Sequence, residues 1–169
     1  MKKILFVLVA LLCVSMQAAA QKVGYVDTEK ILSAIPAYKS AQQQLDALGK
    51  QYQAVIEAEY KKIELLYNKY QQQKGNLTAQ GRQAKENEII RMEQAVKEMQ
   101  KEYFGAEGTM QEHSARLLDP IKVKVDAAIG QVAKKGGYMI ILDIASMQGV
   151  AYSNEAYDLS GEVIRLLGY

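Results

Sequence analysis

The segment IIRMEQAVKEMQKEY, residues 89–103, places an apolar side chain at alternating steps of three and four residues. The same spacing continues to residue 117, and its positions are Ile89, Met92, Val96, Met99, Tyr103, Ala106, Met110, His113 and Leu117. An average step of about 3.5 residues keeps the side chains on one stripe of a helix, as in the seam of a coiled coil. We therefore predict a long helix from Arg82 to Leu118.

A second stripe lies upstream, with steps averaging nearly 3.6 residues. Its positions are Leu45, Leu48, Tyr52, Ile56, Tyr60, Ile63, Tyr67 and Tyr70. Helix-forming residues dominate, no proline lies between Pro36 and Pro120, and we predict a helix from about Thr28 to Lys74. Between the stripes, KGNLTAQG at 74–81 has the composition of a turn, in which Asn76 or Thr78 could cap the second helix.

These features predict an antiparallel helical hairpin over residues 38–117, with its tip near 74–81. At 1.5 Å per residue the two helices would span roughly 70 Å and 55 Å, so we expect the hairpin to protrude from a small body. Gly105 and Gly108 are a candidate bend in the second helix.

The two ends of the chain, residues 21–37 and 118–169, predict that small body. Residues 23–27 alternate as a strand, Asp27 or Thr28 can cap the next helix, and residues 34–37 interrupt it. Downstream, Asp119-Pro120 is typical of a helix start, and the glycines at 136–137 are typical of a helix end.

Two more strands are expected, at 138–144 and 149–153, followed by a last helix capped by Asp158. The first of them is nearly all apolar, which predicts cover on both faces. Because three short strands make a poor core and leave open edges, we expect an oligomer whose body strands complete one sheet or barrel. The candidate assembly residues are Val23, Tyr25, Ile140, Leu142, Val150 and Tyr152. The fold class is α+β, mostly α.

The N-terminus has the pattern of a secretory signal peptide. Lys2 and Lys3 precede an apolar run too short to span a bilayer, and Ala18-Ala19-Ala20 forms a cleavage pattern. We expect cleavage after Ala20, giving residues 1–20 as the signal peptide and a periplasmic product; an uncleaved anchor is the alternative. The product would retain neither of the two N-terminal lysines nor Cys13, the chain's one cysteine.

Composition argues against catalysis and against nucleic-acid binding. The chain has 169 residues, a net charge of +2, one cysteine and one histidine, His113. A single thiol and a single imidazole exclude an internal disulfide and most metal sites, and no nucleophile–histidine–acid set or phosphate loop is present. We expect no enzyme activity, no cofactor and no nucleic-acid partner.

Charge is unevenly distributed along the expected product. Residues 61–101 carry nine basic and five acidic side chains, whereas the rest, without the two N-terminal lysines, carries ten basic and fourteen acidic ones. Either this is an ordinary solvated helix surface, or it is a basic tip that binds acidic segments of a client or anionic lipid headgroups. The candidate tip residues are Lys69, Lys74, Arg82 and Lys85. The Tyr and Met stripe is interpreted as coiled-coil core, with contact to clients as the alternative.

The chain resembles the Skp/OmpH family of periplasmic chaperones for outer-membrane proteins. The matching segments, in order, are Lys22-Val-Gly-Tyr-Val-Asp-Thr-Glu-Lys-Ile-Leu32, Ile35-Pro36-x-Tyr38, Asp119-Pro-Ile121, Gly137-Tyr-Met-Ile-Ile-Leu-Asp143, Val150-Ala-Tyr152 and Asp158-Leu-Ser-Gly-Glu-Val-Ile-Arg-Leu-Leu167. The resemblance implies a homotrimer with a β-barrel body and three helical tentacles around a cavity. The chain differs from well-known members in charge, since those members are strongly basic and the expected product is neutral overall.

The expected function is that of an ATP-independent holdase, which sequesters unfolded outer-membrane proteins in this cavity. The alternative is a structural coiled-coil adaptor of the cell envelope, such as the hairpin of an efflux-pump linker. That alternative expects β-rich modules on both sides of the hairpin, for which the chain has little room.

Overall fold

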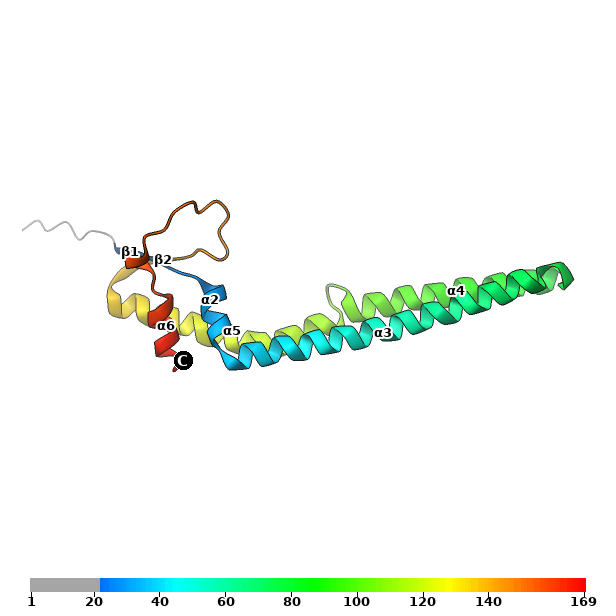
Figure 1. Ribbon diagram of the computed structural model, residues 1–169, viewed down its shortest axis with the longest axis horizontal. Helices are drawn as coiled ribbons and strands as arrows, with labels where there is room; N and C mark the ends of the chain where they lie inside the picture. The colour runs from blue at the N-terminus through cyan, green and yellow to red at the C-terminus, as the bar shows by residue number, and fades with distance from the viewer. Residues whose placement is uncertain (1–21) are drawn as a thin grey trace, which may run out of the picture. The chain divides into compact units, whose positions relative to one another are not determined.

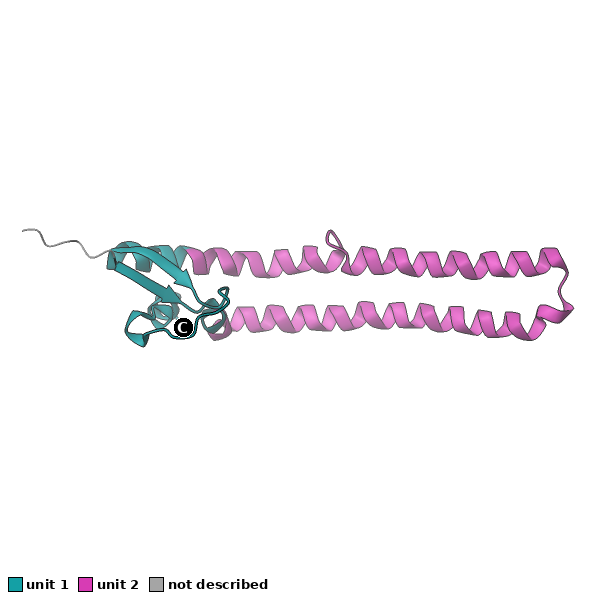
Figure 2. Cartoon of the chain, turned by 90° about the horizontal axis from the view of Figure 1, so that it is seen from above, with its two compact units in different colours: residues 1–31, 127–169 teal, residues 32–126 magenta. Residues whose placement is uncertain are grey.

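The computed structural model describes residues 22–169, so the expected signal peptide lies outside the described residues. Two compact units are present, one of residues up to Ile31 together with Ala127–Tyr169 and one of Leu32–Asp126 (Figure 2). Helices dominate both units, and a two-stranded sheet lies in the first, so the expected mostly α, α+β class is confirmed.

The sheet pairs the two strands that the sequence placed near residues 25 and 140. Strand β1 (Lys22–Val26) runs parallel to β2 (Tyr138–Asp143), with Val23 opposite Ile140 and Tyr25 opposite Leu142. Side chains from β1, α2 (Thr28–Ala34), the end of α5 (Thr109–Gly136) and α6 (Ser160–Leu166) form the core beside this sheet. Its most deeply buried apolar members are Val26, Ile31 and Val163.

Two expectations for this unit were wrong. Residues 149–153 form no strand; they lie in a long loop between β2 and the 3-10 helix η2 (Glu155–Tyr157), drawn in orange in Figure 1. Among the described residues, an isolated bridge joins Tyr25 on the free side of β1 to Asp158. Nor is β2 covered on both faces, because Met139, Ile140 and Leu142 are all exposed. Within residues 22–169, a single chain therefore supplies no strand partner for the apolar segment at 149–153 and no cover for β2.

The second unit contains the expected helical hairpin. Helix α3 (Pro36–Gln73) packs against α4 (Ala79–Phe104) through a buried cluster whose apolar members are spaced seven residues apart on each helix (Figure 1). The cluster consists of Ile56, Ile63, Tyr70, Ile89 and Val96, with Met92, Met99 and Tyr103 packed against it. The seam expected at 89–103 is thus confirmed. Tyr60 and Tyr67, however, were assigned to the core and are 43% and 48% exposed, because each lies four residues past a buried isoleucine and points to the side of the seam.

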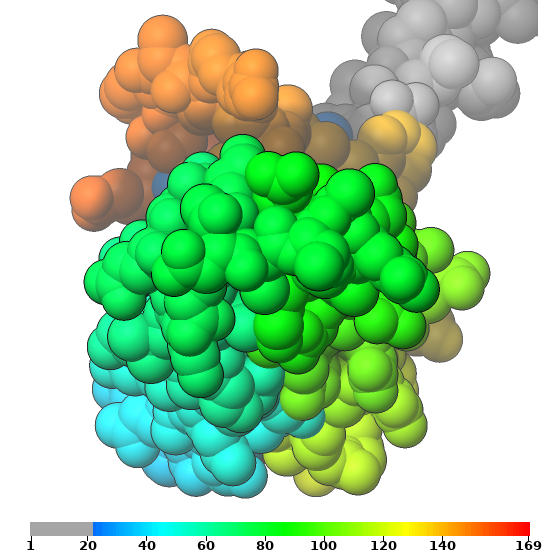
Figure 3. All heavy atoms as spheres, turned by 90° about the vertical axis from the view of Figure 1, so that its right-hand side faces the viewer, coloured from blue at the N-terminus to red at the C-terminus, as the bar shows by residue number. Residues whose placement is uncertain are grey.

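The turn at the tip follows the sequence expectation closely. A 3-10 turn, η1 (Lys74–Asn76), ends α3, and Thr78 is the N-cap of α4, with its hydroxyl accepting a hydrogen bond from the Gly81 amide at 3.1 Å. Of the two candidate caps, Thr78 is therefore the one used. Figure 3 shows this end of the hairpin facing the viewer.

The second helix of the hairpin ends before the expected boundary at Leu118. Helix α4 ends at Phe104, and α5 begins at Thr109, so the expected bend at Gly105 and Gly108 is a true break. A Cβ on Gly105 would lie 2.4 Å from the Lys101 carbonyl oxygen, and one on Gly108 would lie 2.7 Å from that of Glu102. Both positions therefore need glycine. Ala106, which was expected on the apolar seam, lies in this break instead.

The helix start expected at Asp119-Pro120 was wrong, because α5 runs through both residues. Asp119 does not cap; its carboxylate lies 4.0 Å from the ammonium of Lys122, one turn further on. Pro120 removes the amide that would donate to Arg116, but both residues are exposed, so the lost hydrogen bond costs less than it would in a core. The helix ends at Gly136, with Gly137 at φ +65°, as the glycine pair predicted.

Candidate functional site

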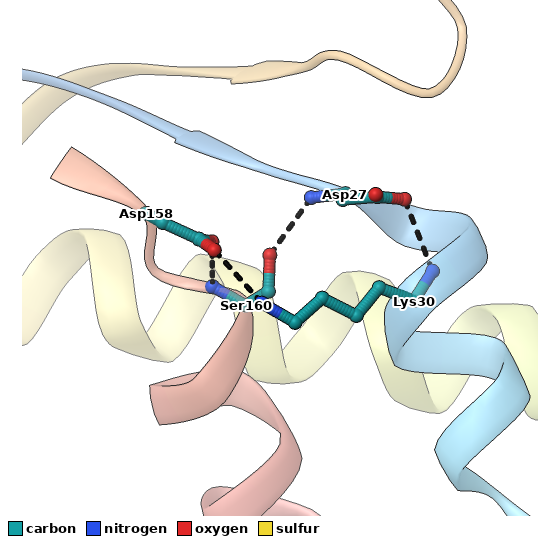
Figure 4. A network of polar contacts seen from close by, with 4 residues as sticks. All are labelled: Asp27, Lys30, Asp158 and Ser160. Atoms are coloured by element: carbon teal, nitrogen blue, oxygen red, sulfur yellow. Dashed lines mark hydrogen bonds and ion pairs between the residues drawn. The ribbon is translucent and has the colours of Figure 1, made fainter. Parts of the chain in front are cut away.

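A polar network ties the N-terminal segment of the body to its C-terminal helix (Figure 4). The Asp27 amide donates to Ser160 Oγ at 2.9 Å, and the Ser160 amide donates to Asp158 Oδ1 at 2.8 Å. Lys30 Nζ forms an ion pair with Asp158 Oδ2 at 2.9 Å, while the Lys30 amide donates to Asp27 Oδ1. Asp158 was expected at the start of the last helix; Lys30, its partner 128 residues away, left no signal in the sequence.

The charges in this network influence each other. The hydrogen bond to Asp158 and the charge of its carboxylate raise the pKa of Lys30. Burial works against ionisation of Asp158, but hydrogen bonds from Ser160 and Lys30 and the Lys30 charge outweigh it, so the pKa of Asp158 lies below its usual value. Both shifts favour the ion pair at neutral pH.

A second carboxylate holds the end of β2. Asp143 accepts hydrogen bonds from the amide and the hydroxyl of Thr28, at 3.1 and 2.8 Å, and from the Ala145 amide at 3.1 Å. Asp143 and Asp158 therefore anchor the two ends of the loop between β2 and α6 to the same short segment, residues 25–30. The ends of this loop are fixed, whereas its middle is exposed.

The expected assembly residues share an exposed apolar character. Val23, Ile140, Leu142, Val150 and Tyr152 are all exposed, Tyr152 to 82%, and Tyr25 is half-buried. Pairing in the sheet brings Val23 beside Ile140 and Tyr25 beside Leu142, whereas Val150 and Tyr152 lie in the loop. Contiguous exposed apolar residues of this kind mark surfaces that contact another molecule.

The outer part of the hairpin carries the expected basic residues. From residue 65 to residue 85 the chain has four basic side chains and no aspartate or glutamate. Lys69, Lys74 and Arg82 are exposed, and within the described chain no carboxylate forms an ion pair with them. Lys85 differs, because its ammonium lies 2.7 Å from Glu88 and part of its charge is neutralised there. The hydrogen bond and the charge of Lys85 lower the pKa of Glu88.

Tyr70 links the two helices beside this basic surface. Its ring is buried, its hydroxyl donates a hydrogen bond to the Glu86 carboxylate, and the Lys74 ammonium lies 5.6 Å from the ring centre. The hydrogen bond to Glu86, followed by burial, raises the pKa of Tyr70. Glu86, the first acidic residue after the basic stretch, is therefore engaged with a neutral hydroxyl and leaves Lys74 and Arg82 without a carboxylate partner.

Two negative findings concern the described residues only. Between residues 22 and 169 no group of three or more histidine, cysteine, aspartate or glutamate side chains could hold a metal ion. No described helix is long and apolar enough to cross a membrane.

Comparison with known proteins identifies relatives of this chain. The family model described as Outer membrane protein (OmpH-like) matches residues 22–167. The Chaperone protein Skp of Vibrio cholerae serotype O1 is 29% identical over 157 residues, covering 88% of this chain and 85% of that protein. A 2.83 Å crystal structure, described as that of an OmpH-like outer membrane chaperone from Caulobacter crescentus CB15, has the same fold. It superposes with a TM-score of 0.63 at 15% identity, over 88% of this chain and 85% of that one. Since the family match spans nearly every described residue, this chain belongs to the OmpH-like outer membrane protein family.

Proposed function

We propose that this protein is an ATP-independent holdase chaperone of the periplasm, which sequesters unfolded outer-membrane proteins between helical hairpins. Membership of the OmpH-like family is the observation that carries this proposal, and the relative from Vibrio cholerae is itself named a chaperone. The expected signal peptide at residues 1–20 supports export to the periplasm.

Self-association is the second element of the proposal. Residues 21–37 and 118–169 would form the body of a homotrimer, in which the exposed apolar residues of β1, β2 and the loop at 149–153 meet those of other copies. An uncovered two-stranded sheet and an apolar loop that pairs with no strand among the described residues support it, because such short sheets are unstable alone.

Two measurements test the proposal together. The mass of the purified protein in solution gives its oligomeric state. Dilution of a urea-unfolded outer-membrane β-barrel protein into buffer, with and without the chaperone, shows by light scattering whether aggregation is suppressed. We expect a trimer that suppresses aggregation without ATP; a monomer without this effect would contradict both elements.

The basic tip is proposed to attract acidic client segments or anionic lipid headgroups. Three exposed cations without carboxylate partners, Lys69, Lys74 and Arg82, support attraction over roughly 8–10 Å in physiological salt. The double charge reversal Lys69→Glu/Lys74→Glu should slow client capture at low salt, and the difference should shrink as salt is added. The matched reversal Lys39→Glu/Lys124→Glu, on exposed positions away from the tip, is the control. Equal capture rates for the two variants would remove the tip from the mechanism.

A further inference from the structure

The four residues between α4 and α5, the 105–108 loop, stand out from an otherwise continuous helical limb. Figure 2 shows α4 and the first part of α5 in line, with the chain between them projecting to one side. The Thr109 hydroxyl lies 3.3 Å from the carbonyl oxygen of Glu102 and donates to it. In a helix, threonine makes this bond to a residue three or four places before it. Thr109 therefore takes the place that residue 105 or 106 would have in a continuous helix, and the loop is surplus to the limb.

Contacts with α3 agree with a surplus of four residues. On the side of the loop nearer the tip, the ring of Tyr103 stacks on that of Tyr52, with ring centres 4.2 Å apart. Counted from that pair without interruption, Met110 would stand opposite Leu45. It lies instead beside Gly49, where an added Cβ would be 3.8 Å from the Met110 methyl. The limb thus changes its register along α3 by four residues at the loop.

The apolar spacing of the sequence runs through the loop as if the loop were helical. Met99, Tyr103, Ala106 and Met110 follow each other at steps of four, three and four residues. A helix that included residues 105–108 would therefore keep a single seam. Glycine weakens a helix interior without excluding it, so the sequence is compatible with both a looped-out and a helical conformation of this segment.

A displacement of four residues also restores apolar pairing between the two helices. In the observed register, counted from Tyr52 and Tyr103, Ile63 stands opposite Met92. If the loop joined the helix, α4 would move by about 6 Å towards the tip and turn by about 40°. Members of the seam would then face each other in three pairs, which are Ile56 with Tyr103, Ile63 with Val96 and Tyr70 with Ile89.

The turn at the tip can follow this movement. When one helix of a hairpin moves by four residues, its turn moves by two, so the turn would cover residues 76–80 instead of 74–78. Helix α3 would gain two residues, and the hairpin would lengthen by about 3 Å. The hydrogen bond from the Gly81 amide to Thr78 and that from Tyr70 to Glu86 belong to the observed register and stabilise it.

We infer that the 105–108 loop stores four residues for a one-turn slip of α4 along α3, which gives the hairpin two registers. One is the observed register, and in the other, the slipped register, the loop has joined the helix. Displacement of one packed element past another by one turn is a two-state change, because the side chains engage again one turn further along. The slip would move the outward side chains of α4 while the seam stays buried. It goes beyond the proposed function and does not depend on it.

Distances between spin labels in the whole protein measure the register. Gln94→Cys/Asp119→Cys places one label on each side of the loop, at exposed positions. Their separation along the limb is about 37 Å in a continuous helix and about 31 Å with four residues looped out. Gln43→Cys/Asn68→Cys has the same separation in sequence within uninterrupted α3, so this control should give about 37 Å in every variant. Double electron–electron resonance is recorded on labelled protein refolded with an excess of unlabelled protein, which suppresses distances between copies.

Gly105→Ala/Gly108→Ala should shift the population towards the slipped register. In the loop, an added Cβ on either residue would collide with a carbonyl oxygen, whereas alanine is the best helix former. We expect a main distance near 31 Å in the wild type and a population near 37 Å that is several-fold larger in the double variant. A pair across the two helices, Gln53→Cys/Asn87→Cys, should lengthen by about 5–6 Å in the same variant, because α4 moves past α3.

Deletion of residues 105–108 tests the surplus separately. The shortened chain joins Phe104 to Thr109 in the observed register. It should keep the helical content of the wild type, melt at no lower temperature and show only the distance near 31 Å. Loss of helical content or a lower melting temperature would mean that the limb needs these residues, and would overturn the inference.

Two outcomes of the distance measurements would also overturn it. In one, the double glycine variant keeps only the distance near 31 Å, so that no slipped register exists. In the other, the distance across the loop lengthens but the distance between α3 and α4 does not, so that the loop becomes helical without a slip. Neither outcome affects the proposed function, because suppression of aggregation is measured on the unmodified protein.

Discussion

Replacing Ile63 by alanine tests whether the hairpin is held by its seam. Ile63 is 6% exposed and belongs to the buried cluster between α3 and α4. Burial of this kind makes isoleucine-to-alanine substitutions cost about 2–5 kcal/mol. The seam lies between only two helices, which can move together to fill part of the cavity. We therefore expect the lower half of that range, about 2–3 kcal/mol.

The matched control lies two residues away in the same helix. Leu65 is 70% exposed, so Leu65→Ala should change the free energy of unfolding by no more than about 0.5 kcal/mol. Urea unfolding followed by far-UV circular dichroism gives both values. All variants are compared at one protein concentration, because the proposed self-association would make the apparent stability depend on it. Equal losses in the two variants would refute a hairpin stabilised by this seam.

Three further predictions concern the break and the polar network. Gly108→Ala should destabilise the protein by about 1–3 kcal/mol, because its Cβ would lie 2.7 Å from a carbonyl oxygen, whereas Gly75→Ala, with nothing within 4 Å, should be nearly neutral; thermal unfolding of both checks this. Ser160→Ala should cost about 1–3 kcal/mol in urea unfolding, because Ser160 is fully buried and its loss leaves the partly buried Asp27 amide without its hydrogen-bond acceptor. Because the pKa of Asp158 is lowered, its contribution to stability is present above about pH 4 and is lost as the pH falls through the folded-state pKa. In Asp158→Asn the free energy of unfolding should therefore fall less steeply with decreasing pH, and the same acid dependence as in the wild type would contradict this.

Local periodicity was enough to predict the hairpin from the sequence. The seam from Ile89 to Tyr103 and the turn capped by Thr78 depend on residues close together in the chain, so their spacing predicted them correctly. Tyr60 and Tyr67 show the limit of that reasoning. The spacing identifies one stripe of the helix, but only the facing helix decides which positions of that stripe are buried.

The errors arose where distant contacts compete with a local signal. Asp119-Pro120 has the composition of a helix start, but α5 already begins at Thr109 and runs through both residues. Residues 149–153 have the composition of a strand, yet a strand needs a neighbour, and one copy of the chain offers none in the described residues. Lys30, the ion-pair partner of Asp158, and Thr28, which donates to Asp143, lie more than a hundred residues upstream, beyond the reach of any local pattern.

The parallel pairing of β1 with β2 has a consequence for the order of folding. The Thr28–Asp143 hydrogen bonds at its end join residues 115 positions apart, so the sheet has high contact order although most of the molecule consists of local helices. The hairpin can form as soon as α3 and α4 are both available, within microseconds to milliseconds, and it shortens the loop that must close. Until residues 138–143 are available, however, β1 has no strand to pair with. Pairing of β1 with β2 should therefore be the slowest step of folding. A chain that ends before residue 138 should form the α3–α4 hairpin but no sheet.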